Sequence, residues 1–459
     1  MSFHLGKPIA VMILLAVVSG VLALRTPPVE RADLRVWAFA GSHVRSFRNP
    51  DPATGVSLIG LYQQRTGRSV RVDQLATRAL DIRLISLFMN DTIGDDVPDL
   101  AEIEIGSVGK FFRPPVDQVG FLPLNDLLER DGLLDQVVRA RFAPWTKDGV
   151  IFGVPHDLHP VGITYRKDLF DQAGIDLAAA KTWAEFHEMC LAFVRYWREQ
   201  GYPHRWALEL PSSSGDYLTL MLLQRGINIL DDRNNVYLDD PRVAETIAFY
   251  AQLVAGPKRV AGDATPGGHL WTQDIVRGDL CATITPDWRV GYLRTLAPAL
   301  SGKVRLMPLP RFEPTDAPTS TWGGTMIAIA RRAADTEAAW DLLKFLYFSN
   351  EGLRARQRET MILPPMRAHW ADPAYHQDDP FFGGQKANEL FIELADQIPP
   401  RYVTPFSVFG TQSLATVLNR ATAYINERGA DGLQEQVQRW LNEEAEHLRR
   451  RVAFGEFDE

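Results

Sequence analysis

The feature that most limits how this chain can fold is an alternation of short apolar runs with helical patterns, which begins at Asp33. Short apolar runs favour buried strands, whereas apolar residues spaced three and four apart favour helices. On this basis the first part of the chain is predicted to hold strands at 34–39, 69–75 and 100–105, and helices at 56–66, 81–90 and 107–112. This order predicts an α/β fold with a mostly parallel sheet covered by helices, whose ligands would bind beyond the carboxyl ends of the strands.

The alternation of predicted strands and helices is interrupted at 149–165, an extended segment that contains Pro155 and Pro160. Proline removes a donor from the strand ladder, so the segment is predicted to be a crossing between two lobes. Further crossings are predicted at 308–318 and 362–365. The other predicted elements are helices at 183–198, 216–226, 241–254 and 336–348, strands at 282–285, 304–309 and 326–330, and a helical tail with an apolar stripe of Leu433, Val437, Trp440, Leu441 and Leu448.

Length and composition narrow the class of protein. At about 100–200 residues per domain, 459 residues are enough for two or three domains. The 57 acidic residues outnumber the 49 basic ones, and the net charge of -8 excludes a general basic surface for nucleic acid. Cys190 and Cys281 are the only cysteines, too few for a zinc site, and a disulfide between them stays open without their geometry.

An uncharged apolar run, Pro8 to Leu24, lies near the N-terminus. Its length is at the lower limit of a membrane span, about 17–25 residues, so a cleaved signal peptide and a retained anchor both stay open. The small residues Val21 and Ala23 predict a cut after Ala23. Residues 1–24 are therefore predicted to export the chain to a periplasmic or other extracytoplasmic space. No cysteine follows the run, so any anchoring is expected to be by the uncleaved helix or through the partner.

The residues that could carry catalysis or bind a metal form no complete site. His156, Asp157 and His159 offer three ligands, but in an extended chain His156 points away from the other two, which leaves a metal site incomplete. Glu102 and Glu104 share one face of a predicted strand, and two acids from one strand cannot easily flank a scissile bond. The chain also lacks a phosphate-binding loop and a Gly-x-Ser-x-Gly elbow. The sequence predicts no catalytic residue, no metal and no cofactor.

Aromatic residues gather at predicted strand ends and loops instead. A large aromatic residue is more often part of a core than of a site. Trp288, however, follows a strand and Pro286, and Trp322 precedes two glycines that let another group approach the backbone. Rings beside carboxylates suit a neutral polyol, whose C–H faces stack while its hydroxyls bond to polar groups. The candidates are Trp37, Phe39, Trp271, Trp288, Trp322, Phe406 and Phe409.

Several segments together match a known family. The longest is DGVIFGVP at 148–155, followed by VGITYRKDLF at 161–170, AGI at 173–175 and TWAEF at 182–186. Shorter ones are VPDL at 97–100, FLPL at 121–124, PDW at 286–288, MPLP at 307–310, WGG at 322–324 and a helix that begins AAW at 338–346. In their order and spacing over about 400 residues, they resemble the family 1 extracellular solute-binding proteins of ABC importers, in the sugar-binding group similar to maltose-binding protein.

The resemblance implies a two-lobed periplasmic-binding-protein fold of type II, with mixed sheets flanked by helices and three crossings between the lobes. The first lobe is expected at 33–153 plus 307–360 and the second at 154–306 plus 361–459. The implied function is to bind a carbohydrate between the lobes and deliver it to membrane permease subunits, as a monomer and without catalysis. A sensor that signals to a membrane receptor is the alternative.

The resemblance also implies a set of ligand-binding residues. Trp288 and Trp322 are expected to face one ligand from opposite lobes, with Gly323 and Gly324 closing the first-lobe side. His159 replaces the acidic or polar residue of many relatives, which leaves the sugar unidentified. The others are Phe39, Ser42, His43, Glu104, Asp157, Ser213, Tyr217, Asp287, Phe406 and Phe409.

Overall fold

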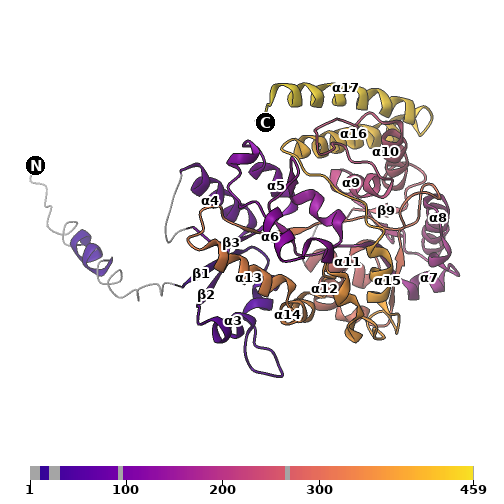
Figure 1. Ribbon diagram of the computed structural model, residues 1–459. Coiled ribbons are helices and arrows are strands. Elements are labelled where there is room, and N and C mark those ends of the chain that lie inside the picture. The colour runs from indigo at the N-terminus through magenta and orange to yellow at the C-terminus, as the bar shows by residue number, and fades with distance from the viewer. Residues whose placement is uncertain (1–10, 20–31, 91–96, 264–268, 458–459) are drawn as a thin grey trace, which may run out of the picture.

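The computed structural model describes residues 11–19, 32–90, 97–263 and 269–457, whose arrangement is drawn in Figure 1. Within the predicted export segment, residues 11–19 are helical and exposed. The predicted cut after Ala23 lies outside the described residues. None of the helices in these ranges combines the length and the apolar character that crossing a membrane requires.

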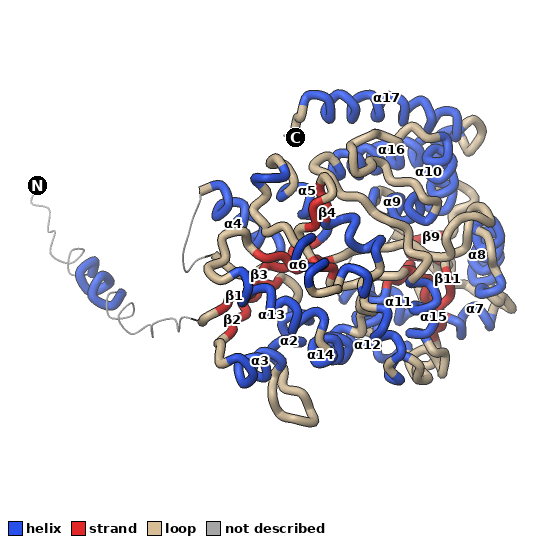
Figure 2. Tube along the Cα trace, in the orientation of Figure 1, coloured by secondary structure: helices blue, strands red, loops and turns tan. Residues whose placement is uncertain are grey.

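The first lobe is built on a five-stranded mixed sheet, in red in Figure 2, with helices on both faces. The strand at residues 325–329 runs antiparallel to both of its neighbours. Its side chains alternate between two apolar cores, with Ile327 and Ile329 on one face of the sheet and Met326 and Ala328 on the other. In spatial order the strands are β2 (Val70–Gln74), β1 (Leu34–Ala38), β3 (Leu100–Glu104), β12 (Thr325–Ile329) and β6 (Val154–Pro155). The helices are α2 (Gly41–Arg48), α3 (Leu58–Thr66), α4 (Thr77–Met89), α5 (Ile105–Phe111), α6 (Asn125–Arg130), α13 (Thr336–Phe348) and α14 (Asn350–Thr360).

The second lobe has its own five-stranded mixed sheet. Its spatial order is β11 (Val304–Pro308), β7 (Val161–Arg166), β10 (Ala282–Pro286), β8 (Leu208–Glu209) and β9 (Ala261–Gly262). The helices are α7 (Lys167–Gln172), α8 (Trp183–Glu199), α9 (Gly215–Gln224), α10 (Pro241–Val254), α11 (His269–Arg277), α12 (Asp287–Leu296), α15 (Ala387–Ala395), α16 (Ser407–Arg428) and α17 (Leu433–Phe454). A hairpin of β4 (Thr146–Lys147) and β5 (Val150–Ile151) forms a separate small sheet.

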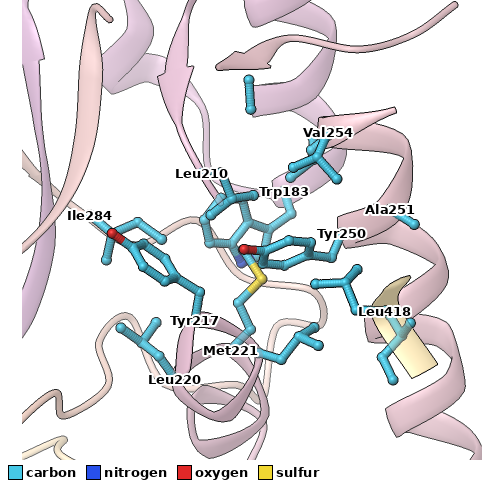
Figure 3. Close-up of a cluster of buried hydrophobic side chains, with 14 of the residues drawn as sticks. Trp183, Leu210, Tyr217, Leu220, Met221, Tyr250, Ala251, Val254, Ile284 and Leu418 are labelled. Carbon is cyan, nitrogen blue, oxygen red and sulfur yellow. The ribbon is translucent and has the colours of Figure 1, made fainter. Parts of the chain in front are cut away.

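Local sequence explains where α8 begins. α8 starts with a capping box, in which the Thr182 hydroxyl accepts the backbone N–H of Glu185 and the Glu185 carboxylate accepts that of Thr182. Trp183, Met221, Tyr250 and Leu418 then pack together from α8, α9, α10 and α16, as the close-up in Figure 3 shows. The predicted stripe of α17 is buried at Leu433, Val437, Leu441 and Leu448, whereas Trp440 is only partly buried.

The chain passes between the two sheets through extended segments. Residues 156–160 join β6 to β7, and residues 309–324 join β11 to β12. Residues 361–386 lead from α14, which packs on α2, to α15, which packs on β7 and β11. Figure 1 accordingly shows α13 and α14 of the later sequence beside α3 of the earlier sequence.

Two sequence predictions need correction here. Met307 and Pro308 pair with β7, so the second sheet continues past the predicted lobe boundary at residue 307, and β6 keeps Val154 and Pro155 in the first sheet. The sequence also did not predict α2, since its segment GSHVRSFR is polar and no side chain caps its start. Its buried face, which includes Val44 and Phe47, forms only because α14 packs against it.

Candidate functional site

A cavity of about 700 Å³ lies over the second lobe and is lined by five aromatic side chains. Tyr217, Trp322, Trp288 and Tyr292 form a chain of edge-on contacts, with successive ring centroids 4.6, 5.7 and 5.8 Å apart. Trp271 is the fifth and is buried. Cavities of about 300–1,000 Å³ with a few placed polar groups are typical of small-molecule sites.

A strand-to-helix junction positions Trp288. β10 ends at Pro286, and α12 begins at Asp287, whose carboxylate accepts the backbone N–H of Trp288 at 2.7 Å. The indole Nε1 of Trp288 donates to the backbone oxygen of Trp322 at 2.9 Å. The two predicted tryptophans are therefore fixed to each other, and both remain partly exposed beside the cavity.

Trp322 nevertheless does not belong to the first lobe, contrary to the sequence prediction. The crossing 309–324 remains bound to the second lobe as far as Thr321. Ser320 Oγ donates to the Leu220 backbone oxygen at 2.7 Å, and Thr321 forms an isolated antiparallel β-bridge with Pro160. Trp322 then packs against the core of the second lobe. The aromatic walls of the cavity thus come from the second lobe and this crossing alone.

A buried ion pair supports the floor of the cavity. Arg289 Nη2 donates to Glu209 Oε1 at 2.9 Å, and the Tyr217 hydroxyl donates to the same oxygen at 3.0 Å. The Arg289 guanidinium carbon lies 4.4 Å from the ring centroid of Trp271 and 5.2 Å from that of Trp322. Burial acts to raise the pKa of Glu209, but Arg289 outweighs it and the pKa is lowered. Both charges are therefore retained, and they hold the rings in place.

Three other predicted residues form a buried network beside the cavity. His159 Nδ1 lies 2.6 Å from Asp287 Oδ1, and its Nε2 lies 3.0 Å from Asp157 Oδ2. Burial disfavours the charged imidazole, but the two carboxylates outweigh it and raise the pKa of His159 to about 9. His159 is therefore an imidazolium at neutral pH, and its ring nitrogens are occupied by protein carboxylates.

This network joins all three crossing segments. Asp157 and His159 belong to the first, and Asp157 Oδ2 accepts the backbone N–H of Thr325 at 3.0 Å, where the second ends. Asp287 Oδ2 accepts the backbone N–H of Leu363, in the third, at 2.8 Å. Arg141 also binds the carboxylate of Asp157. These residues connect the crossing segments and do not line the cavity.

Gly323 and Gly324 lie between the network and the cavity without lining it. Gly323 has φ 88°, and a Cβ there would lie 3.3 Å from Trp288 Nε1 and 3.4 Å from His159 Cδ2. A Cβ on Gly324 would lie 2.7 Å from Arg141 Nη2. A residue with a Cβ would be strained at either position.

The first-lobe candidates lie outside the cavity lining. His43 Nδ1 is 2.9 Å from Glu102 Oε2, and the Tyr347 hydroxyl donates to Glu102 Oε1 at 2.7 Å. Phe39 contacts His43 edge-on, and Ser42 is partly buried at the start of α2. The buried Glu102 carboxylate is thus satisfied by protein groups.

Among the residues that the structure describes, His43, Glu102 and His156 come closest to forming a metal site. One potential ligand atom from each lies within 4.8 Å of the other two. The two histidine rings, however, are stacked with centroids 3.9 Å apart and planes 20° apart. Ring-nitrogen lone pairs lie in the ring plane, so in stacked rings they run side by side instead of converging as a tetrahedral zinc site requires. We assign no metal to this group.

Phe406 and Phe409 are part of the core, which corrects the prediction that they stack on a ligand. Phe406 is stacked on Phe457, with ring centroids 5.0 Å apart. The Arg451 guanidinium carbon lies 4.3 Å from the ring centroid of Phe409. α16 begins at Ser407, and its packing against α9 and α17 turns both rings away from the cavity.

A smaller pocket of about 290 Å³ adjoins the aromatic cavity and shares Asp216 and Thr411 with it. α5 of the first lobe lines one wall, and α9 with the segment 401–405 lines the other. The walls approach closely, since a Cβ on Gly109 of α5 would lie 2.6 Å from the Thr404 backbone oxygen. Glu104, at the start of α5, accepts the backbone N–H of Gly106 at 2.8 Å.

Of the predicted residues, Ser213, Tyr217, Trp271, Trp288 and Trp322 line the aromatic cavity together. The sequence did not identify Glu209, Asp216, Arg289 or Arg401 as site residues. Arg289 directly follows the PDW motif at 286–288, and this position could have identified it as a site residue. Glu209 lies on a two-residue strand and Arg401 in a loop, and no local pattern marks either.

A model of bacterial extracellular solute-binding proteins matches residues 62–383. In sequence, the chain is 26% identical over 377 residues to an arabinooligosaccharide-binding protein of Halalkalibacterium halodurans. The aligned region covers 80% of this chain and 79% of the relative.

Two solved structures show the same fold. The sugar-binding protein MalE from Xanthomonas citri superposes with a TM-score of 0.71 at 19% identity, covering 92% of this chain and 99% of that one. An ABC-transporter-associated binding protein from B. animalis subsp. lactis, in complex with β-1,6-galactobiose, gives a TM-score of 0.64 at 20% identity, covering 91% and 98%. The fold is therefore the predicted two-lobed, type II α/β architecture.

Proposed function

Because the chain belongs to the bacterial extracellular solute-binding protein family, we propose that it binds a carbohydrate between its lobes and delivers it to the permease of an ABC importer. The observation that supports this most directly is the chain of aromatic rings from Tyr217 to Tyr292 along one cavity. Ring faces stack on the C–H faces of sugars, and the neighbouring Ser213 and Asp216 offer hydrogen bonds to hydroxyls.

The sugar class follows from the relatives. One is named for arabinooligosaccharides and one solved neighbour holds β-1,6-galactobiose, so neutral pentose or hexose oligomers are the ligands to test first. The proposed contact residues are Ser213, Tyr217, Trp288 and Trp322, with Phe39, Ser42, His43 and Glu104 reaching the ligand only if the lobes close.

The chain is proposed to act by binding alone. Glu102, a conceivable catalytic acid, is completely buried and hydrogen-bonded to His43 and Tyr347. Residues 1–24 are proposed to export the chain, and the mature protein is proposed to work outside the cytoplasm as a monomer. A sensor role remains the second candidate, and permease genes beside its own gene would favour import.

A thermal-shift screen of arabino-, galacto- and malto-oligosaccharides tests the proposal. Binding to the folded state alone raises the melting temperature by mass action, so at least one series should stabilise the protein. Trp288→Ala should then weaken binding by about 1–3 kcal/mol, the usual loss when a ring at a binding hot spot is truncated. Its melting temperature without sugar should stay close to wild type.

Trp440→Ala is the matched control, since it removes the same ring from a partly buried position of α17 outside the cavity. It should leave sugar affinity unchanged. Stabilisation by amino acids or metal ions and by no sugar would refute the ligand class. A large fall in the unliganded melting temperature of Trp288→Ala would instead place this ring in the core.

A further inference from the structure

The smaller pocket contains a cation without a partner. Within the residues that the structure describes, the Arg401 side chain makes no hydrogen bond, no ion pair and no ring contact, although it lines this pocket and is only partly exposed. The other two cations of the pocket are engaged: Lys110 pairs with Asp81 at 3.0 Å, and Arg113 donates to the Phe457 backbone oxygen at 3.2 Å. Burial lowers the pKa of Arg401, and the charges of Asp216 and Glu104 oppose this effect.

Asp216 is an anion of the same pocket that also lacks a partner among the described residues. Its carboxylate is exposed where the two cavities meet, and among the described residues it has no ion pair and no hydrogen bond. Any distance between its oxygens and the Arg401 nitrogens therefore exceeds 4.0 Å, the limit of an ion pair. An acceptor and a donor of full charge thus share one pocket without forming an ion pair.

We propose that Asp216 and Arg401 form a second sugar subsite, so that the ligand is a neutral oligosaccharide that occupies the aromatic cavity with one unit and this pocket with the next. The inference rests on the proposed carbohydrate function. Adjacent hydroxyls of a sugar can accept a hydrogen bond from a guanidinium and donate one to a carboxylate at the same time.

The charges around the pocket favour a neutral ligand over an acidic one. Lys110, Arg113, Arg401 and the anion Asp216 line the pocket, and two further anions lie outside the lining: Asp81, which pairs with Lys110, and Glu104, whose charge acts on Arg401. A uronate carboxylate that reached Arg401 would also meet Asp216 and Glu104, and it would be repelled. A hydroxyl pair meets no such penalty.

Isothermal titration with arabinotriose and arabinose tests the subsite, with galactotriose and maltotriose beside their monosaccharides in case another series binds. Arg401→Gln and Asp216→Asn should each weaken trisaccharide binding by about 10- to 100-fold, the loss expected when a charged hydrogen bond is removed. Monosaccharide affinity should stay within about twofold of wild type in Arg401→Gln, because one unit fills only the aromatic cavity and Arg401 does not line it. Asp216 lines both cavities, so Asp216→Asn should weaken the binding of both ligands. If wild type binds no monosaccharide, the trisaccharide series decides alone.

Arg113→Gln is the matched control, since it removes a cation from the same pocket that already has a partner, and it should change neither affinity. Unchanged trisaccharide binding in Arg401→Gln and Asp216→Asn overturns the subsite, as does an equal loss of monosaccharide affinity in Arg401→Gln. Tighter binding of trigalacturonate than of neutral trisaccharides overturns the neutral-ligand assignment. If wild type binds no sugar of any series, the proposed function itself fails, which distinguishes the two failures.

Discussion

His159 shows how one side chain can serve the hinge instead of the ligand. Its backbone has φ 53°, a left-handed conformation that costs a residue other than glycine roughly 1–2 kcal/mol. The turn places both ring nitrogens against the carboxylates of Asp157 and Asp287. The strain is therefore offset by an ion triplet that connects the crossings.

This arrangement predicts a loss of stability in alkaline solution. The pKa of His159 is about 9 in the folded chain, against about 6.5 for a free histidine. The folded state holds the proton more tightly, so the stabilisation is complete below about pH 6.5 and is lost as the pH rises through 9. We expect the free energy of unfolding, measured with urea, to fall by up to about 3 kcal/mol across this window.

His159→Gln should remove most of that dependence between pH 6.5 and 9.5, because glutamine carries no proton to lose. His376→Gln, at an exposed histidine, should keep the wild-type slope. Equal slopes for wild type and His159→Gln would show that the proton of His159 does not stabilise the fold.

The loop 322–324 couples the hinge to the aromatic cavity through its backbone. Gly323→Ala adds a Cβ at φ 88° and 3.3 Å from Trp288 Nε1. We expect the variant to lose about 1–2 kcal/mol of stability, because a Cβ disfavours the left-handed conformation. Sugar affinity should fall about tenfold, since the displaced indole loses alignment with Trp322.

Gly132→Ala separates these two effects. Gly132 has φ 64°, and a Cβ there would meet nothing within 4 Å. Urea unfolding should show a similar loss of stability, whereas calorimetry should show unchanged sugar affinity. If Gly323→Ala also leaves affinity unchanged, the loop does not position Trp288.

The elements also show what a sequence can and cannot predict. The strand at 100–105 was predicted from the apolar residues of its short segment, LAEIEI. The stripe of α17 was predicted from apolar residues that recur on one face of a helix. The sequence does not predict which residues a side chain contacts. Phe406 and Phe409 resemble rings that stack on a ligand from a loop, and only the packing of α16 against α17 shows that they belong to the core. Arg401 stands out only once its lack of a partner is known.

For the molecule as a whole, we expect a rigid-body closure of the two lobes on ligand. Each lobe has its own sheet and its own apolar cores, and they are joined by segments that contain Pro160, Pro310 and Pro364. Small-angle scattering at saturating sugar should give a smaller radius of gyration than without sugar, and far-ultraviolet circular dichroism should stay the same. Trp288→Ala at the same sugar concentration should retain more of the open form. Superimposable curves for wild type at proven saturation would contradict closure.

The one-sided construction of the aromatic cavity has a consequence for the timing of capture. Because Trp271, Trp288 and Trp322 belong to the second lobe and its outgoing crossing, a sugar can dock before the first lobe arrives. The association rate is then set by collision with an open, preformed surface, and lobe closure determines how long the sugar stays. A permease that holds the lobes apart would shorten that residence time without moving any of the aromatic side chains that line the cavity.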